Sequence, residues 1–497
     1  MNNDTIANEL PALTANMLRE GGCLIDNLFA DLWKHMGMKA RINRVGFAKR
    51  SGTPTHELVY CLILWVWLKV NSINMFSREA LQAFSKAEQD ALYDALNRED
   101  WNWRRLHTEN ALQAVKSLKT QKKNSAFIFD DSIKHRSGKK MPGVSSHFDH
   151  TSGRCVMGQQ VLTLGLGCEN GFVPLDSELF ISDSKKQGLF KPFEDGRSVA
   201  AKRYRVALNQ TKPEMAESMI CRAIRAGFEA EFMLADAWFC TKAMINMACE
   251  QGLTPVLRVK KNQTKYRITE QQGDQVIHKD LDIKEIYQSC IRCKWEKIPG
   301  QKYQAKAQDV ELNLCTEKKG AAKWIKVRLV FVRGIDLDEK EQVGKHDWAV
   351  FLTTDLSLEP QRILELYAMR WAIEVYFKEA KQHLGFLKEQ GRHYAAYVAS
   401  IHLTAIRFCM LVVGKCMHNA SGICDMRKQI TTNVASINYA TQLWQVFRAI
   451  ITGALDEMKA LLGDVVTQVL ETIERHVQAF FVQALQLDTQ TMRLESC

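Results

Sequence analysis

Apolar residues recur at helical spacing over residues 358–388, and this pattern predicts one long helix. Placed at about 100° per residue, six apolar side chains fall within one arc of roughly 80° that would face a core: Leu366, Met369, Ile373, Phe377, Ala380 and Leu384. Four polar side chains fall within an adjacent arc of roughly 60°: Tyr367, Arg370, Glu374 and Lys381. Pro360 suits the first turn, and Gly385 supplies a stop signal. One carboxylate is therefore held among two cations and a phenol beside the buried face.

Helical periods also dominate residues 1–118. The apolar run Leu58–Leu68 is too short to span a bilayer, so it predicts a buried helix. Ser77 is a candidate N-cap for a further helix that runs to Leu96. This region could insert a helix into a groove of DNA or form a dimerisation bundle, and its pattern leaves both roles open.

Short apolar runs replace the helical period from residue 126 onward. Ala126–Asp130 predicts a buried strand with carboxylates at its C-terminal end, and Glu231–Asp236 predicts a second strand that ends in an acid. The other predicted elements are a hairpin of residues 159–167 and 172–180, helices at 197–209, 213–227 and 241–251, and strands at 254–259 and 348–354. Strands thus alternate with helices, which indicates an α/β architecture.

Residues 260 to about 345 alternate apolar and polar positions between Lys-rich turns, which predicts several short strands with little helix. Trp295 and Trp324 are candidates for stacking on a base, a contact worth about 1–3 kcal/mol. A Trp that covers the sheet explains either residue more simply. After Gly391 the pattern is helical again, and an apolar stripe from Val466 to Phe481 is either core or a subunit interface.

Composition narrows the class of protein. The chain has 497 residues, 46% of them hydrophobic and 25% charged, which suits a globular protein of two to four domains. Its formal net charge is +11, and residues 104–140 hold ten Lys or Arg against three Asp or Glu. Such a stretch suits DNA phosphates, and equally a solvated surface. The 14 cysteines fit no usual zinc spacing, and without a secretory signal we expect reduced thiols in the cytoplasm.

The polar arc of the long helix has a specific spacing: Tyr367, two residues, Arg370, three residues, Glu374, six residues, Lys381. An amphipathic helix with i,i+4 charge pairs is the simpler interpretation of such a face. All four positions nevertheless match the Tyr-Arg-Glu-Lys signature of a group of bacterial insertion-sequence DDE transposases, which this stretch resembles. In that family the Glu is the third metal-binding carboxylate, and the other three residues contact DNA at the transposon end.

The resemblance implies a ribonuclease H-like catalytic core, interrupted by a β-rich insertion between the second Asp and the Glu. In that fold the first Asp lies on the first strand, the second just after the fourth strand, and the Glu on a helix after the last strand. Asp130, Asp236 and Glu374 stand at these places. Asp131 is an alternative to Asp130. We prefer Asp130, because it ends the apolar run and begins, with Ser132 as third member, an Asp-x-Ser pattern often seen in the family.

Three carboxylates suit the cleavage of a phosphodiester. Two divalent cations about 3.5–4 Å apart would neutralise charge on the phosphorus, activate a water or 3′-hydroxyl and stabilise the leaving oxyanion. Mg²⁺ takes hard oxygen ligands, so we expect Mg²⁺, with Mn²⁺ as a substitute, at Asp130, Asp236 and Glu374. A lone Asp after a strand is also commonly a helix N-cap, which is the alternative role of Asp236.

Several side chains are candidates for contacts with DNA. Arg370 would grip a phosphate bidentately, Lys381 would act as a point charge, and Tyr367 would hydrogen-bond a phosphate oxygen. A basic loop follows Asp130 closely and could track the strand being cut. Its candidate DNA-binding residues are Lys134, Arg136, Lys139 and Lys140. Arg258, at the end of a strand, is a further candidate.

These expectations combine into one hypothesis. The fold class is α/β: a ribonuclease H-like catalytic core interrupted by a β-rich insertion, with helical N-terminal and C-terminal regions. The predicted divisions are a helical DNA-binding domain at 1–118, a core in two parts at 119–259 and 346–415, the insertion at 260–345 and a helical region at 416–497. The chain would act as a transposase on double-stranded DNA, as a homodimer, in a bacterial cytoplasm and away from membranes. The rivals are a metal-dependent nuclease that does not join DNA, and a transposase descendant that only binds it.

Overall fold

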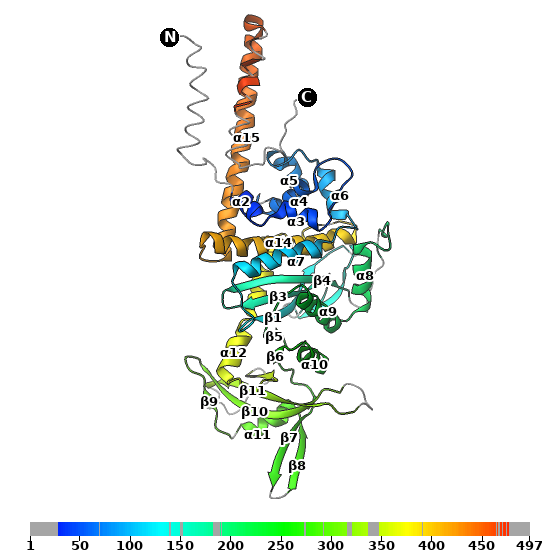
Figure 1. The fold of residues 1–497 in the computed structure, drawn as a ribbon, viewed down its shortest axis with the longest axis vertical. Coiled ribbons are helices and arrows are strands. Elements are labelled where there is room, and N and C mark those ends of the chain that lie inside the picture. Colours follow the sequence, from blue (N-terminus) through cyan, green and yellow to red (C-terminus); the bar gives the residue numbers. More distant parts are fainter. Residues whose placement is uncertain are drawn as a thin grey trace. The chain divides into compact units, whose positions relative to one another are not determined.

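The protein, seen here as a computed structural model, divides into two compact units (Figure 1). Unit 1 comprises Met1–Asn110, Lys381–Gly391 and Ala395–Cys497, and unit 2 comprises Ala111–Ala380 and Arg392–Tyr394. The residues that the structure describes are 28–68, 70–138, 141–149, 153–181, 189, 191–272, 275–291, 293–315, 321–335, 347–389, 391–463, 465, 468–469, 471–473 and 475–476. The apolar stripe predicted from Val466 to Phe481 lies mostly outside the described residues.

Unit 1 is helical, as its periodicity predicts. Its described helices are α2 Leu28–His35, α3 Met38–Arg44, α4 Thr55–Leu64, α5 Ile73–Glu79, α6 Gln89–Asn97, α14 Tyr394–His418 and α15 Ile423–Leu462, with 3-10 turns η1 Trp65–Leu68 and η2 Leu81–Ala83. α7, Trp103–Ser117, runs from unit 1 into unit 2. By length and composition α14 could cross a membrane, yet its most apolar window is wholly buried inside the protein. Such burial is typical of a core helix.

The predicted N-cap at Ser77 is wrong. Ser77 lies inside α5, and its hydroxyl donates to the carbonyl oxygen of Asn74 at 2.8 Å. The helix is capped instead by Ser72, whose Oγ accepts a hydrogen bond from the backbone N–H of Met75 at 3.1 Å. Ser72 has extended backbone and directly precedes the first helical residue, which is the geometry that an N-cap requires.

A fully buried arginine on α14 satisfies the end of another helix in unit 1. Arg407 donates from Nε to the carbonyl oxygen of Ile63 at 3.0 Å, and from Nη1 to that of Leu384 at 2.7 Å. Its Nη2 donates to the carbonyl oxygen of Leu62. Because the last carbonyls of a helix lack partners within it, the guanidinium stabilises the C-terminal end of α4. Burial lowers the pKa of Arg407 to about 10.

In its described part, unit 2 is built on one mixed sheet of 12 strands. The strands are β1 Ala126–His135, β2 Ser145–Asp149, β3 Arg154–Cys168, β4 Gly171–Phe180, β5 Phe232–Ala235, β6 Thr254–Arg258, β7 Tyr266–Gln272, β8 Gln275–Leu281, β9 Glu296–Lys297, β10 Tyr303–Asn313, β11 Trp324–Gly334 and β12 Trp348–Thr353. Their order is β2-β3-β1-β5-β6-β12-β11-β10-β7-β8, with β4 beside β3 and β9 beside β10. β5 pairs in parallel with β1 and with β6, whereas the other pairs are antiparallel.

Helices cover this sheet in the order that the pattern predicts. They are α8 Val199–Asn209, α9 Lys212–Arg225, α10 Lys242–Glu250, α11 Ile283–Cys290, α12 Pro360–Ala368 and α13 Trp371–Gln382. α9 packs against β3 and β4, and α10 packs against β6 (Figure 1). The predicted hairpin is present as β3 and β4. The predicted α/β class is therefore confirmed.

The prediction of a single helix over residues 358–388 is wrong, because a turn at residues 369–370 separates α12 from α13. The N–H of Arg370 donates to the carbonyl of Tyr367 at 3.0 Å, and the N–H of Ile373 to that of Arg370 at 3.2 Å. These bonds span three residues rather than four, so the backbone tightens at this point. The core-facing stripe continues through the break: Met369 is half-buried, and Leu366, Ile373, Phe377, Ala380 and Leu384 are buried.

Between β6 and β12 the chain forms β7 to β11 and the helix α11, so the strands predicted in this region are present. They extend the same sheet, because β11 pairs with β12 over Arg328–Arg333. The division of the chain into five regions stays a prediction.

Candidate active site

Asp130 and Asp236 follow two neighbouring parallel strands. β1 pairs with β5 only through Ala126–Ile128, so Asp130 lies two residues beyond the last pair. Asp236 directly follows β5. The prediction that Asp130 ends its strand is wrong, because β1 continues to His135 while paired with β3. The separation of β1 from β5, rather than the end of a strand, leaves room for these carboxylates.

Arg370 joins Asp130 to Glu374. Its Nη1 lies 3.1 Å from Asp130 Oδ2, and its Nη2 lies 2.5 Å from Glu374 Oε1. The exposed fractions of the side chains are 13% for Arg370, 21% for Asp130 and 36% for Glu374. Arg370 occupies the turn between α12 and α13, and this turn lets one guanidinium contact both a strand and the following helix. The structure thus brings together three of the predicted site residues.

The pKa of Asp130 reflects its burial first and the neighbouring charges second. Burial, first, and the neighbouring carboxylates Asp131 and Asp236 raise this pKa to about 7. The N–H of Asp131, which donates to Asp130 Oδ1 at 2.8 Å, and the charge of Arg370 act in the opposite direction. Asp236 is therefore close enough to Asp130 to disfavour its ionisation.

Tyr367 belongs to the same group of side chains. Its ring packs on Phe351 with centroids 4.7 Å apart, and the guanidinium of Arg370 lies 5.6 Å from its ring centroid. Burial raises the pKa of the Tyr367 phenol, while the charges of Arg370 and Arg258 oppose this shift. Lys381, the fourth residue of the signature, lies in the last turn of α13, in the part of that helix that belongs to unit 1.

Asp131 has a different environment from Asp130. Neighbours on a strand point to opposite faces of the sheet. Gln160 donates from Nε2 to Asp131 Oδ1 at 2.6 Å, and Lys212 Nζ lies 2.7 Å from Asp131 Oδ2. The charge of Asp131 is thus neutralised by Lys212. Of the two adjacent acids, only Asp130 contacts Arg370.

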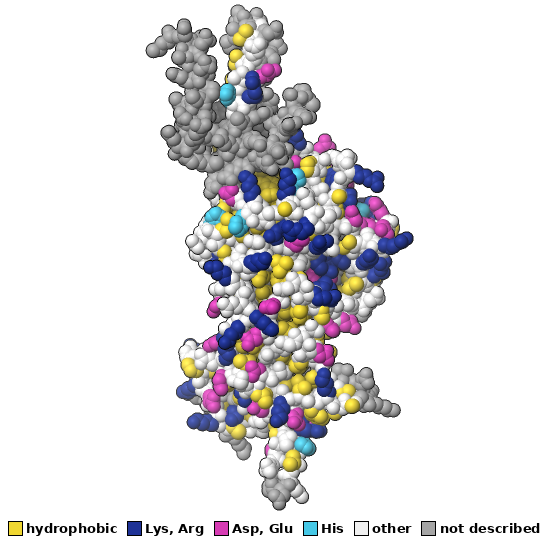
Figure 2. All heavy atoms as spheres, in the orientation of Figure 1, with side chains coloured by type: hydrophobic (Ala, Val, Ile, Leu, Met, Phe, Trp, Pro, Cys, Tyr) yellow, Lys and Arg dark blue, Asp and Glu magenta, His cyan; other side chains and the backbone are white. Residues whose placement is uncertain are grey.

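The basic loop after Asp130 is described in part. Lys134 lies on β1 four residues after Asp130, so the two side chains point to the same face of the sheet. Arg136 directly follows this strand and donates from Nε to Gln159 Oε1 at 2.8 Å. Lys139 and Lys140 lie outside the described residues. On the face seen in Figure 2, Lys and Arg side chains gather over the part of unit 2 that contains α8 and α9.

The site combines a partial match and a mismatch to a divalent metal. Within the described chain, no three His, Cys, Asp or Glu side chains lie close enough together to hold an ion. Arg370 instead bridges two of the three predicted ligands. The chemistry of the donors nevertheless fits a hard cation, because Asp130, Asp236 and Glu374 offer only carboxylate oxygens. Asp130 and Glu374 share a single arginine, so negative charge remains that a cation would neutralise.

Sequence reasoning missed basic residues around Trp238, which follows Asp236 closely. Trp238 is 39% exposed, and its backbone N–H donates to Asp236 Oδ1 at 2.9 Å. Lys212 Nζ lies 4.9 Å from the centroid of its ring, and Lys260 Nζ lies 5.3 Å from it. These lysines come from the start of α9 and from the residues after β6. The Trp stands two residues after Asp236 in the sequence, whereas the two lysines approach it only in the fold.

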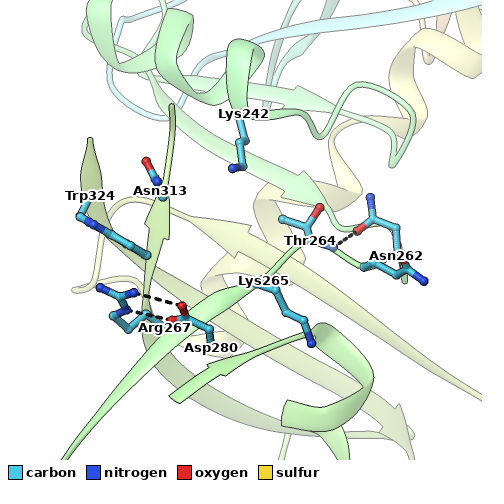
Figure 3. A pocket seen from close by; sticks show the side chains of 9 residues that line it. Lys242, Asn262, Thr264, Lys265, Arg267, Asp280, Asn313 and Trp324 are labelled. Atoms are coloured by element: carbon cyan, nitrogen blue, oxygen red, sulfur yellow. Dashed lines mark hydrogen bonds and ion pairs between the residues drawn. The ribbon is translucent and has the colours of Figure 1, made fainter. Parts of the chain in front are cut away.

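A hollow lies among α10, β7, β10 and β11 (Figure 3). Its volume is about 970 Å³, and its lining includes Lys242, Asn262, Lys265 and Trp324. The guanidinium of Arg267 lies 3.9 Å from the ring centroid of Trp324. The other predicted stacking residue is covered in a similar way: the guanidinium of Arg333 lies 4.2 Å from the ring of Trp295, which therefore packs on its own sheet.

Two family models match the chain. One, described as DDE superfamily endonuclease, matches residues 69–279, and the other, described as Transposase DDE domain, matches residues 205–410. Asp130 falls in the first match, Glu374 in the second, and Asp236 in both. A comparison with curated proteins found no match. The two family matches, on a mixed α/β fold consistent with a DDE-type nuclease, support a DDE transposase, an enzyme whose substrate is DNA.

Proposed function

We propose that this protein is a DNA transposase that cleaves the ends of an insertion sequence and joins the freed 3′ ends to target DNA. One observation carries the proposal: Arg370 holds Asp130 and Glu374 together beside Asp236, inside the region that the DDE models match. A structural ion pair explains two charged groups. A third acid beside them, with the pKa of Asp130 raised to about 7, is typical of a functional site.

Asp130, Asp236 and Glu374 would hold divalent metal, Mg²⁺ or Mn²⁺, as DDE nucleases generally do. Bound there, the metal neutralises charge on the phosphate, lowers the pKa of an attacking water and stabilises the leaving oxygen. The protein's own cations would orient the DNA. Arg370 would exchange a carboxylate for a phosphate oxygen, and Tyr367 and Lys381 would contact the adjoining phosphates.

The other parts of the proposal concern architecture and partners. We assign the ribonuclease H-like core to residues 119–259 and 346–415, with residues 260–345 as its insertion. The helical N-terminal region and the basic residues Lys134, Arg136, Lys139 and Lys140 would bind double-stranded DNA. A homodimer suits the reaction, because two ends of one element must be handled together. We place the protein in the bacterial cytoplasm.

The decisive experiment follows cleavage and joining of labelled DNA that carries the ends of the element, in Mg²⁺. We expect both activities in the wild type and neither in Glu374→Gln, a loss of at least about 10³-fold for one metal ligand. Glu365→Gln is the matched control, because Glu365 is an exposed acid on α12 whose carboxylate contacts Arg362 at 3.3 Å and Gln361 at 3.0 Å on the same helix. Binding without cleavage by the wild type in Mg²⁺ and in Mn²⁺ would refute the catalytic proposal.

A second candidate is a nuclease of the same fold that cuts without joining. The description of the first family model as an endonuclease favours it. The same assay separates the two candidates, since a nuclease releases cut ends and yields no joined product.

A further inference from the structure

The two aspartates of the proposed site are each oriented by a backbone N–H that follows closely in the sequence. Asp130 Oδ1 accepts a hydrogen bond from the N–H of Asp131 at 2.8 Å. Asp236 Oδ1 accepts one from the backbone N–H of Trp238 at 2.9 Å. Each bond ties one carboxylate oxygen to a backbone segment, so the orientation of each carboxylate depends on where that segment lies.

The side chains of these two hydrogen-bond donors meet at one ammonium group. Lys212 Nζ lies 2.7 Å from Asp131 Oδ2 and 4.9 Å from the ring centroid of Trp238. The second distance is within the range of a cation–π contact. The exposed fractions of the Lys212 and Asp131 side chains are 13% and 23%, so solvent screens their ion pair only in part. One ammonium therefore contacts both segments that orient the aspartates.

The backbone of Lys212 is held firmly, because this residue begins α9. The preceding residue, Thr211, donates from its N–H and its hydroxyl to the carboxylate of Glu214, at 2.7 and 2.8 Å, and so caps the helix. Pro213 follows Lys212 and restricts the first turn further. α9 itself packs against β3 and β4 of the sheet. The ammonium is thus a fixed point relative to the sheet.

We infer that Lys212 is a positioning residue that fixes the carboxylates of Asp130 and Asp236 relative to one another. It acts through Asp131 and Trp238, one on each segment, and within the described residues it pairs with neither aspartate of the site. The inference rests on the proposed function and adds a residue to its site. Residues that orient metal-binding carboxylates without touching the metal typically change metal affinity about 10–100-fold when they are replaced.

Two simpler roles for Lys212 predict different results. If it acted only through its charge, its loss would tighten the binding of a cation by the acids, because a repelling charge is gone. If it only anchored α9, its loss would lower stability and leave metal affinity unchanged. The double variant Asp131→Asn/Lys212→Met separates these roles from positioning. It removes one charge of each sign and nearly preserves side-chain size, so the net charge of the site stays the same.

The test is calorimetric titration of the full chain with Mn²⁺ in the absence of DNA. We expect the double variant to bind Mn²⁺ about tenfold more weakly, and to need about tenfold more Mg²⁺ for half-maximal cleavage of labelled element ends. Lys212→Arg keeps the charge and should stay within about threefold of the wild type. Arg222→Gln is the matched control, because Arg222 also lies on α9 and pairs with Asp176 at 2.7 Å. It should lower the melting temperature and change Mn²⁺ affinity less than about twofold.

Unchanged Mn²⁺ affinity in the double variant, with a wild type that binds Mn²⁺ and cleaves DNA, would overturn the inference and leave the proposed function standing. Tighter binding by Lys212→Met alone, together with normal binding by the double variant, would also overturn it, in favour of a role through charge. A wild type that neither binds Mn²⁺ nor cleaves DNA would overturn the proposed function as well. Thermal melting shows whether each variant is folded. Trp238→Ala supplies a second variant, since it removes the ring from the ammonium, keeps the backbone N–H and should also weaken Mn²⁺ binding.

Discussion

Unit 2 contains two clusters of acids and arginines, and they differ in charge balance and in access to water. In the first, Asp176 and Glu178 on β4 are buried against Arg203 and Arg222 from the helices that follow. Arg203 Nη2 lies 2.7 Å from Glu178 Oε2, and Arg222 Nη2 lies 2.7 Å from Asp176 Oδ2. Within the described residues two acids meet two arginines, so this cluster is balanced in charge, and both acids are closed off from solvent.

The second cluster, around Arg370, is neither neutral nor closed. Asp130 and Glu374 share this arginine, the charge of Asp236 acts on Asp130, and solvent reaches Glu374 over 36% of its side chain. A buried cluster that is balanced in charge stabilises one packing arrangement. Exposed carboxylates in excess of their basic partners are instead suited to binding a cation. Residue types alone therefore do not distinguish structure from function in this unit, but balance and exposure do.

The largest expected effect separates two adjacent acids. Asp130→Asn should reduce the single-turnover rate of DNA cleavage in Mg²⁺ by at least about 10³-fold, because it removes a proposed metal ligand. Asp131→Asn should reduce it less than about tenfold, since the carboxylate of Asp131 is occupied by Lys212 and Gln160. Equal losses in the two variants would contradict the assignment of Asp130.

When stability is measured, a substitution in the closed cluster should have a larger effect than a substitution in the cluster around Arg370. Glu178→Gln leaves the charge of Arg203 buried and should lower the free energy of unfolding by about 3–5 kcal/mol. Glu374→Gln should lower it by less than about 1 kcal/mol, because 36% of the Glu374 side chain is exposed to solvent. Urea denaturation of the metal-free proteins measures both values. A Glu178→Gln variant as stable as the wild type would show that the closed cluster is not structural.

The pKa of Asp130 predicts how metal binding depends on pH. Because this pKa is raised to about 7, the carboxyl group still carries its proton below neutral pH, and a metal ligand must be ionised. Affinity for Mn²⁺ should be constant well above pH 7 and fall about tenfold per unit below it. Calorimetric titration across this range gives the profile. Asp131→Asn removes a neighbouring charge that raises the pKa, so it should move the fall to lower pH, and a flat profile would count against Asp130 as a ligand.

The smallest effect concerns the arginine shared by the acids. Arg370→Met removes the partner of Asp130 and Glu374, so the metal-free protein should lose about 1 kcal/mol of its free energy of unfolding. Saturating Mg²⁺ should then stabilise the variant more than the wild type, because the cation restores the missing positive charge. Thermal denaturation with and without Mg²⁺ measures the difference. Equal stabilisation of both proteins would mean that arginine and metal act independently.

Periodicity predicted most elements of unit 2, because each short strand or helix has one buried face of its own. It failed where local backbone geometry decides. The turn at residues 369–370 leaves the apolar stripe intact, so the pattern over residues 358–388 could not reveal it. The cap at Ser72 lies five residues before Ser77, and both serines fit a helix start equally well.

The candidate site was predictable in its residue types and less so in its contacts. The spacing of the signature placed Arg370 and Glu374 on one face, and the acid after a strand drew attention to Asp130. The contact between Arg370 and Asp130 requires α12 and α13 to approach β1, which is distant in the sequence. No local pattern encodes this approach. Lys260 was missed for the same reason, since its relation to Trp238 exists only in the fold. The catalytic and DNA-binding roles of these residues stay predictions.

Because a turn separates α12 from α13, Tyr367 and Glu374 lie on two different helices, which are joined at Arg370. In a continuous helix the distance between the phenol and the carboxylate would be constant, whereas a small pivot at this joint changes it. The guanidinium also stabilises this turn, since it contacts Asp130 on β1 and Glu374 on α13. A phosphate that binds Arg370, or a cation that binds its carboxylate partners, would weaken these two contacts. Occupancy of the site and the separation of its signature residues should consequently change together.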